Sequence, residues 1–157
     1  MSAMTFGPLE VPVSVSNPPF QRADLKFIGV DHSGSSFEAR VFLNNPQADN
    51  ATPKDPSTGY AGSFYIFGHG GCFGDEGHCD VPQQRATSFD RRPPHQLTPT
   101  TKLVVITAAL RGIVASASGP TPLTVTVVPV VRPSVLAKAA DAATVLMVDT
   151  VQLLTYD

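Results

Sequence analysis

The heptapeptide FEARVFL, residues 37–43, decides the fold class, because it places Phe37, Ala39, Val41 and Leu43 at every second position. Successive side chains of a β-strand point to opposite faces, so these four residues would share one face. Glu38, Arg40 and Phe42 occupy the other face. The spacing therefore predicts a strand that covers one side of a hydrophobic core.

Similar short runs recur on both sides of this strand, separated by proline and glycine. The chain has 15 prolines and 12 glycines, which interrupt helices and favour turns. We expect strands near residues 11–15 (an edge strand, because it contains proline), 23–30, 61–67, 102–106, 123–131, 144–149 and 151–156. One short helix is predicted over 108–114, capped by Thr107, and a hairpin-type loop over 31–36.

Together these segments predict a mainly β fold, namely a two-sheet antiparallel β-sandwich, jelly-roll-like, with one short helix and long loops. We expect residues 1–157 to form a single domain. The long loops would span about 44–60 and 68–99, stretches rich in polar residues, glycine or proline.

The charge and the length of the apolar runs argue against two classes of partner. Of the 157 residues, 42% are hydrophobic and 15% are charged, which suits a folded chain. A net charge of −2 gives no reason to expect nucleic acid or a membrane surface as partner. The apolar runs are far shorter than the roughly 20 residues of a membrane span. No signal peptide is visible at the N-terminus, so we expect a cytoplasmic protein, a mature fragment or one exported with a partner.

The segment 68–80 holds the most unusual side chains, with two histidines, two cysteines and three carboxylates among glycines. One interpretation is a local disulfide between Cys72 and Cys79, which would restrict a loop without other support. A second is a site for Cu(I) or Zn(II) formed by His69, Cys72, His78 and Cys79, although their spacing is not a standard zinc pattern. The third leaves two unpaired, inert thiols.

Two aromatic residues of the predicted loop 68–99 have no evident place in the sheets. Phe73 is followed by glycine near the tip of a glycine-rich segment, where a large ring is costly to leave in water. It either folds back onto its own sheet or inserts into the cleft of a partner, and Phe89 is the competing candidate. No nucleophile elbow or phosphate-binding loop occurs, and we predict no catalytic residue.

Five segments, in this order, resemble the C-terminal β-sandwich domain of tyrosinases, polyphenol oxidases and molluscan haemocyanins, the type 3 copper proteins. They are FEARVFLNNP (37–46), YAGSFYIFGHGG (60–71), KLVVITAALRGI (102–113), LTVTVVPV (123–130) and VQLLTY (151–156). The resemblance implies a non-catalytic accessory domain that packs on the dicopper domain and shields it. It also implies that a side chain, Phe73 or Phe89, plugs the copper site.

The same resemblance implies that this chain is not an enzyme by itself. Type 3 centres use six histidines on helices, whereas this chain has four, namely His32, His69, His78 and His95. No pair has the His-x3-His spacing that would bring two imidazoles onto one helix face. We therefore expect copper in the partner domain, or transiently at the Cys/His segment. Two alternatives stay open: a free-standing metal-binding or copper-delivery protein that uses the segment from His69 to Cys79, and a structural β-sandwich that self-assembles.

Overall fold

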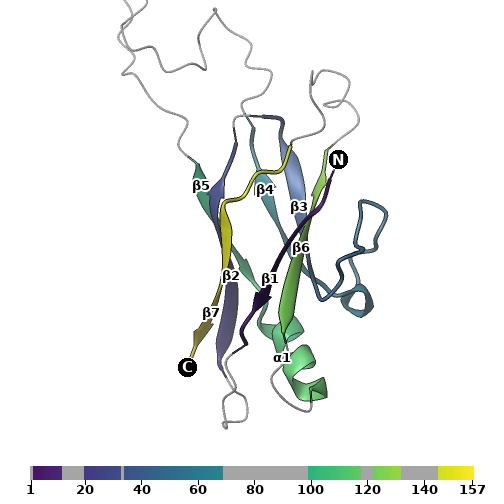
Figure 1. Ribbon diagram of the computed structural model, residues 1–157, viewed down its shortest axis with the longest axis vertical. Coiled ribbons are helices and arrows are strands. Elements are labelled where there is room, and N and C mark those ends of the chain that lie inside the picture. The colour runs from purple at the N-terminus through teal and green to yellow at the C-terminus, as the bar shows by residue number, and fades with distance from the viewer. Residues whose placement is uncertain (1, 12–19, 33, 69–98, 118–121, 132–144) are drawn as a thin grey trace, which may run out of the picture.

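Two antiparallel sheets face each other in the computed structural model, which describes residues 2–11, 20–32, 34–68, 99–117, 122–131 and 145–157 (Figure 1). The elements are β1 (Met4–Leu9), β2 (Arg22–Val30), β3 (Phe37–Leu43), the 3-10 helix η1 (Pro56–Thr58), β4 (Tyr60–Ile66), β5 (Thr100–Val105), α1 (Thr107–Ser116), β6 (Leu123–Val130) and β7 (Thr150–Tyr156). One sheet has the order β1-β6-β3-β4 and the other β5-β2-β7. The predicted mainly β, two-sheet class is confirmed.

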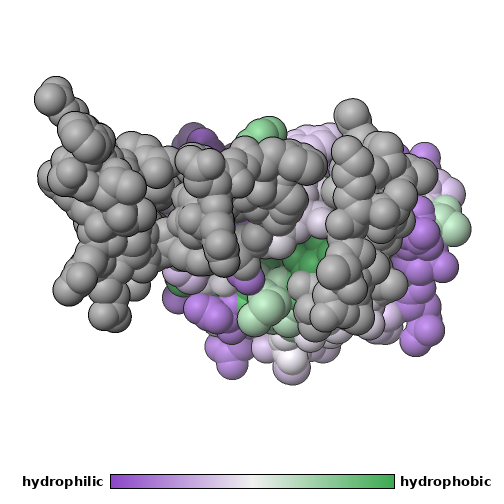
Figure 2. Space-filling view, turned by 90° about the horizontal axis from the view of Figure 1, so that it is seen from above, coloured by the Kyte–Doolittle hydropathy of each residue, from purple (hydrophilic) through white to green (hydrophobic). Residues whose placement is uncertain are grey.

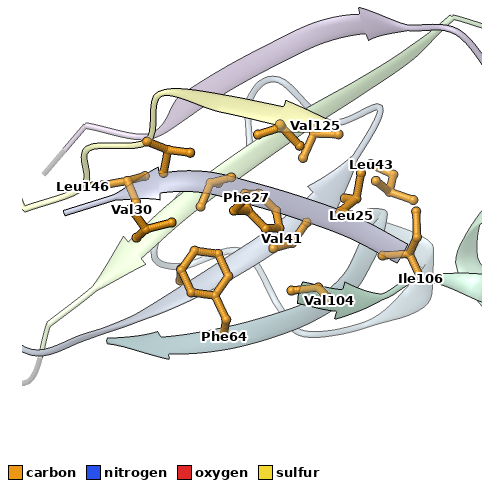
Figure 3. Packing of buried hydrophobic residues seen from close by; sticks show 14 of the residues in the cluster. Leu25, Phe27, Val30, Val41, Leu43, Phe64, Val104, Ile106, Val125 and Leu146 are labelled. Carbon is orange, nitrogen blue, oxygen red and sulfur yellow. The ribbon is translucent and has the colours of Figure 1, made fainter. Parts of the chain in front are cut away.

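The core lies between the sheets and is built by the inward rows of the central strands (Figure 3). Phe27 on β2 and Phe64 on β4 bring their ring centroids to 4.9 Å across the two layers. Leu25 and Val41 are completely buried beside them. Burying side chains of this size contributes about 1.5–3 kcal/mol each, so the alternation seen in FEARVFL fixes which face of β3 turns inward.

Helix α1 follows β5 and attaches to the beginning of β2. The Leu110 side chain is completely buried, and the Ile106 amide donates to the Ala23 carbonyl at 2.8 Å. Thr107 does not cap the helix as predicted, because its hydroxyl lies 3.0 Å from the Ala23 amide and accepts from it. The N-cap position is taken by Ile106, without a side-chain cap. Contact with β2 thus decides where this helix begins.

The connection over 44–60 packs on the outer face of the four-stranded sheet. Phe42 and Val128 of the sheet form a second buried cluster with Ala48 of the connection. The Tyr60 ring meets the Phe42 ring edge-on at 5.6 Å. Asp55 accepts from the Ser57 amide at 2.8 Å and so starts the 3-10 turn η1. This predicted long loop is therefore held by a small core of its own.

Three predictions of secondary structure are wrong or incomplete. The segment 31–36 is not a hairpin loop, because β2 and β3 belong to different sheets and the chain crosses between them. No strand forms over residues 145–149 of the predicted strand 144–149, although Val145, Leu146 and Val148 are buried. Strand β1 was not predicted, while most of the predicted edge strand 11–15 lies outside the described residues.

Candidate functional site

The side chains predicted to carry function lie outside the described residues. This holds for the two candidate plugs Phe73 and Phe89, and for the four candidate metal ligands. Those ligands, which include the two cysteines of the predicted disulfide, are His69, Cys72, His78 and Cys79. Their arrangement therefore stays a prediction. The structure does place the two ends of the segment 69–98, since Gly68 and Pro99 are described.

Both ends of that segment leave the sandwich at one end, opposite helix α1 (Figure 1). Strand β4 ends at Ile66 and β5 begins at Thr100, and these strands are the neighbouring edges of the two sheets. The Gly68 amide donates to the Ser36 hydroxyl at 3.0 Å. A side chain at Gly68 would place its Cβ 2.1 Å from the Gly34 carbonyl oxygen, so the chain needs glycine to leave the sheet here.

A pocket of about 280 Å³ opens at this end of the sandwich. Its lining residues come from the end of β4, the beginning of β5 and the connection after β2. They are His32, Ile66, Phe67, Pro99, Thr100 and Lys102. The Phe67 side chain is 86% exposed, the most exposed large apolar residue of the described part. Hydrophobic residues are visible at this end in the view from above (Figure 2). The pocket thus combines apolar walls with basic and hydroxyl groups.

The outer face of the three-stranded sheet exposes a second apolar surface. Leu103 and Val105 on β5 are 54% and 56% exposed, and Tyr156 on β7 is 45% exposed. Leu154, also on β7, shares this face because both it and Val105 pair with the same residue of β2. We call these four residues, Leu103, Val105, Leu154 and Tyr156, the apolar face. Exposed apolar side chains grouped on a sheet are typical of a contact surface.

The β2 residue between Val105 and Leu154 is Asp24, and an ion pair neutralises it. The Arg22 Nε donates to both carboxylate oxygens of Asp24, at 2.9 and 3.0 Å, and the carboxylate is almost completely buried. This contact raises the pKa of Arg22 above its ordinary value. The Arg22 guanidinium also lies 5.8 Å from the centre of the Tyr156 ring. The apolar face therefore includes no unpaired carboxylate at its centre.

A polar cluster around Glu38 lies on the outer face of the other sheet. The Glu38 carboxylate accepts from the Arg40 Nε at 3.2 Å and from the Ser63 hydroxyl at 2.9 Å, and it forms an ion pair with Lys54. Burial opposes its ionisation, yet the hydrogen bonds from Lys54, Ser63 and Arg40 outweigh burial and hold the pKa of Glu38 below its ordinary value. The cluster fastens the 44–60 connection to the sheet, because Lys54 belongs to that connection.

The described part of the chain has two surfaces that are suited to binding. Among the residues that the structure describes, no group of three or more His, Cys, Asp or Glu side chains is placed to hold a metal ion. No helix in this part of the chain is long and apolar enough to cross a membrane. What this part offers is the pocket at the β4–β5 end and the apolar face, which share strand β5. Neither the pocket nor the apolar face was predicted from the sequence. The alternation of residues over TTKLVV (100–105) is the pattern that could have indicated an exposed apolar row on β5.

Comparisons with known proteins give a likeness of fold. No protein-family model matches the sequence, and no curated protein matches it. A structure of latent aurone synthase, a polyphenol oxidase, co-crystallized with hexatungstotellurate(VI), superposes with a TM-score of 0.53 and 17% identity. Two further structures of the same latent enzyme give TM-scores of 0.49 and 0.47, at 18% and 17% identity. Each match covers 99% of this chain and 24% of the enzyme chain. This chain thus has the fold of a portion, about a quarter, of a polyphenol oxidase chain.

Proposed function

We propose that this chain is a non-catalytic accessory domain of a tyrosinase-like copper protein, which packs on the dicopper domain and shields it. The observation that carries the proposal is the fold shared with 24% of a latent polyphenol oxidase chain at a TM-score of 0.53. The rest of such a chain has no counterpart here. The four histidines of this chain are fewer than the six that the resemblance to type 3 copper proteins implies. Copper would therefore belong to the partner.

The apolar face is the surface that we assign to this contact. Leu103, Val105 and Tyr156 are each about half exposed, so a partner can still remove much apolar area from water. The buried Asp24 carboxylate between them is already paired with Arg22, so covering the face leaves no carboxylate unpaired. A helical domain packed on the face could therefore bury the apolar side chains without burying an unpaired carboxylate.

The segment 69–98 would reach the copper site from the same strand. Pro99 and then β5 follow it directly, and β5 also contributes Leu103 and Val105 to the apolar face. A domain packed against β5 would therefore lie beside the place where the segment returns to the sandwich. In this proposal Phe73 occupies the substrate funnel of the partner, and Phe89 is the competing candidate. The ring would block access of a phenol without taking part in chemistry.

The test is complex formation with the product of the adjoining coding sequence. We expect the same or a neighbouring reading frame to encode a helical domain with six histidines. Co-expressed with this chain, it should form a one-to-one complex in size-exclusion chromatography with light scattering, while this chain alone stays monomeric. A symmetric dimer of this chain, with no complex, would contradict the proposal and support the self-assembling alternative.

A further inference from the structure

Lys102 belongs to the row of β5 residues that face the core. On β5 the side chains of Thr101, Leu103 and Val105 are exposed, whereas Val104 is buried and Lys102 is half-buried. Its register partner on β2 is Phe27, which is completely buried. A lysine on an inward row packs its aliphatic stem against the core and carries its ammonium group toward the edge, where a group of opposite charge would stabilise it.

The compensating group is not supplied by the described part of the chain. None of the described residues forms an ion pair or a side-chain hydrogen bond with Lys102. No carboxylate occurs among the described residues that line the pocket with it, and Thr100, two residues earlier on the same row, adds a hydroxyl donor. His32 is a further lining residue, and Asp31 precedes it without lining the pocket. The polar part of the pocket is therefore built to face an anion.

The rest of the pocket is apolar and partly aromatic. Ile66, Phe67 and Pro99 line it; the Ile66 side chain is buried, whereas Phe67 is 86% exposed. A flat ring placed against Phe67 would remove that side chain from water and form a ring-to-ring contact. The volume of about 280 Å³ also fits one ring with a short acidic group, since a cavity of about 150 Å³ already accommodates benzene.

We propose that this pocket binds a small aromatic carboxylate, with the acid group on Lys102 and Thr100 and the ring against Phe67. This assignment does not depend on a copper partner, since every group in it belongs to this chain. It gives the domain a binding site for a small molecule at the β4–β5 end of the sandwich. The site adjoins the points where the segment 69–98 leaves and re-enters the sheets, at Gly68 and Pro99.

The test is a titration of the ¹⁵N-labelled full chain with benzoate, followed by amide chemical shifts. We expect saturable shifts at Phe67, Gly68, Thr100 and Lys102 in the millimolar range that suits so small a ligand. Acetate, which has no ring, and benzyl alcohol, which has no charge, should each bind at least about tenfold more weakly. Equal binding of acetate would overturn the aromatic assignment, and equal binding of benzyl alcohol would overturn the acid assignment.

Three variants test whether benzoate binds at this pocket or is attracted to positive charge anywhere on the chain. Lys102→Met keeps most of the side-chain length and removes the charge, so benzoate binding should weaken about tenfold or more. Lys26→Met, on the outer face of the neighbouring strand β2, is the matched control and should bind like the parent chain. Phe67→Ala changes a residue that is 86% exposed, so the fold should persist while binding weakens. Benzoate binding that survives both Lys102→Met and Phe67→Ala would overturn the proposal, as would the absence of saturable shifts in the parent chain.

Discussion

The same exchange of valine for threonine at two consecutive positions of β5 should have opposite consequences. Threonine is close to valine in shape and is equally suited to a strand, but it carries a hydroxyl. Val104 is 5% exposed and faces the core, whereas Val105 is 56% exposed and belongs to the apolar face. The pair of variants therefore tests whether the exposed row of β5 exists for the fold or for a partner.

The expected magnitudes follow from these exposures. In Val104→Thr a hydroxyl enters the core without a designed partner, which costs about 1–3 kcal/mol of unfolding free energy. In Val105→Thr the hydroxyl reaches water, so the change should stay within about 0.5 kcal/mol. Complete burial of an apolar side chain is worth about 1.5–3 kcal/mol, and roughly half of that remains available at Leu103 and Val105. The double variant Leu103→Thr/Val105→Thr should thus lose about 2 kcal/mol of partner binding, close to a thirtyfold weaker Kd.

Urea denaturation followed by circular dichroism gives the unfolding free energies, and calorimetric titration with the copper domain gives the Kd. Two results would refute the reasoning. If Val105→Thr destabilises the chain as much as Val104→Thr, the assigned faces of β5 are wrong. If the double variant folds normally and binds the copper domain with unchanged affinity, the apolar face is not the interface.

Three further predictions concern the polar cluster and the segment 69–98. The pKa of Glu38 is lowered in the folded state, so its contribution to stability is complete above its ordinary value of 4.5 and is lost as the pH falls through the lowered value. Urea denaturation between pH 3 and 7 should show a larger loss of unfolding free energy in the parent chain than in Glu38→Gln, because Asp49 and Asp55, whose pKa values are also lowered, titrate in both. Equal losses would argue against the cluster. Thiol titration of the unreduced chain should find no reactive group if Cys72 and Cys79 form a disulfide, whereas two reactive thiols would favour the metal interpretation. Phe73→Ala should raise the activity of the bound copper domain and leave the melting temperature of this chain unchanged; if Phe89→Ala does so instead, the plug is the other ring.

The alternation of apolar and polar residues predicted the central strands well, because the residues that are buried there also pair with neighbouring strands. Strand β3 was predicted at its observed bounds, and β2 and β6 were predicted within one residue at each end, since each turns a regular row toward the core. Strand β1 escaped prediction because MTFGPL contains glycine and proline and pairs only with β6, as an edge strand. Pattern alone did not reveal such an edge.

The false strand at 144–149 has a different cause. Val145, Leu146 and Val148 are apolar because they cover the core, and they do so without ladder pairing. Hydrophobicity reports burial, so a buried connection and a buried strand have the same sequence signature. The pocket was equally hidden, because Phe67 and Lys102 are 35 positions apart in the sequence and meet only where the edges of two sheets adjoin.

The most direct test of the proposed accessory role uses the six-histidine copper domain that we expect beside this chain, and measures its rate of diphenol oxidation with and without this chain bound. The account predicts slow oxidation in the complex and faster oxidation when the Leu103→Thr/Val105→Thr variant replaces the parent chain. An oxidation rate that is the same with and without the chain, at concentrations where the complex forms, would contradict the shielding role.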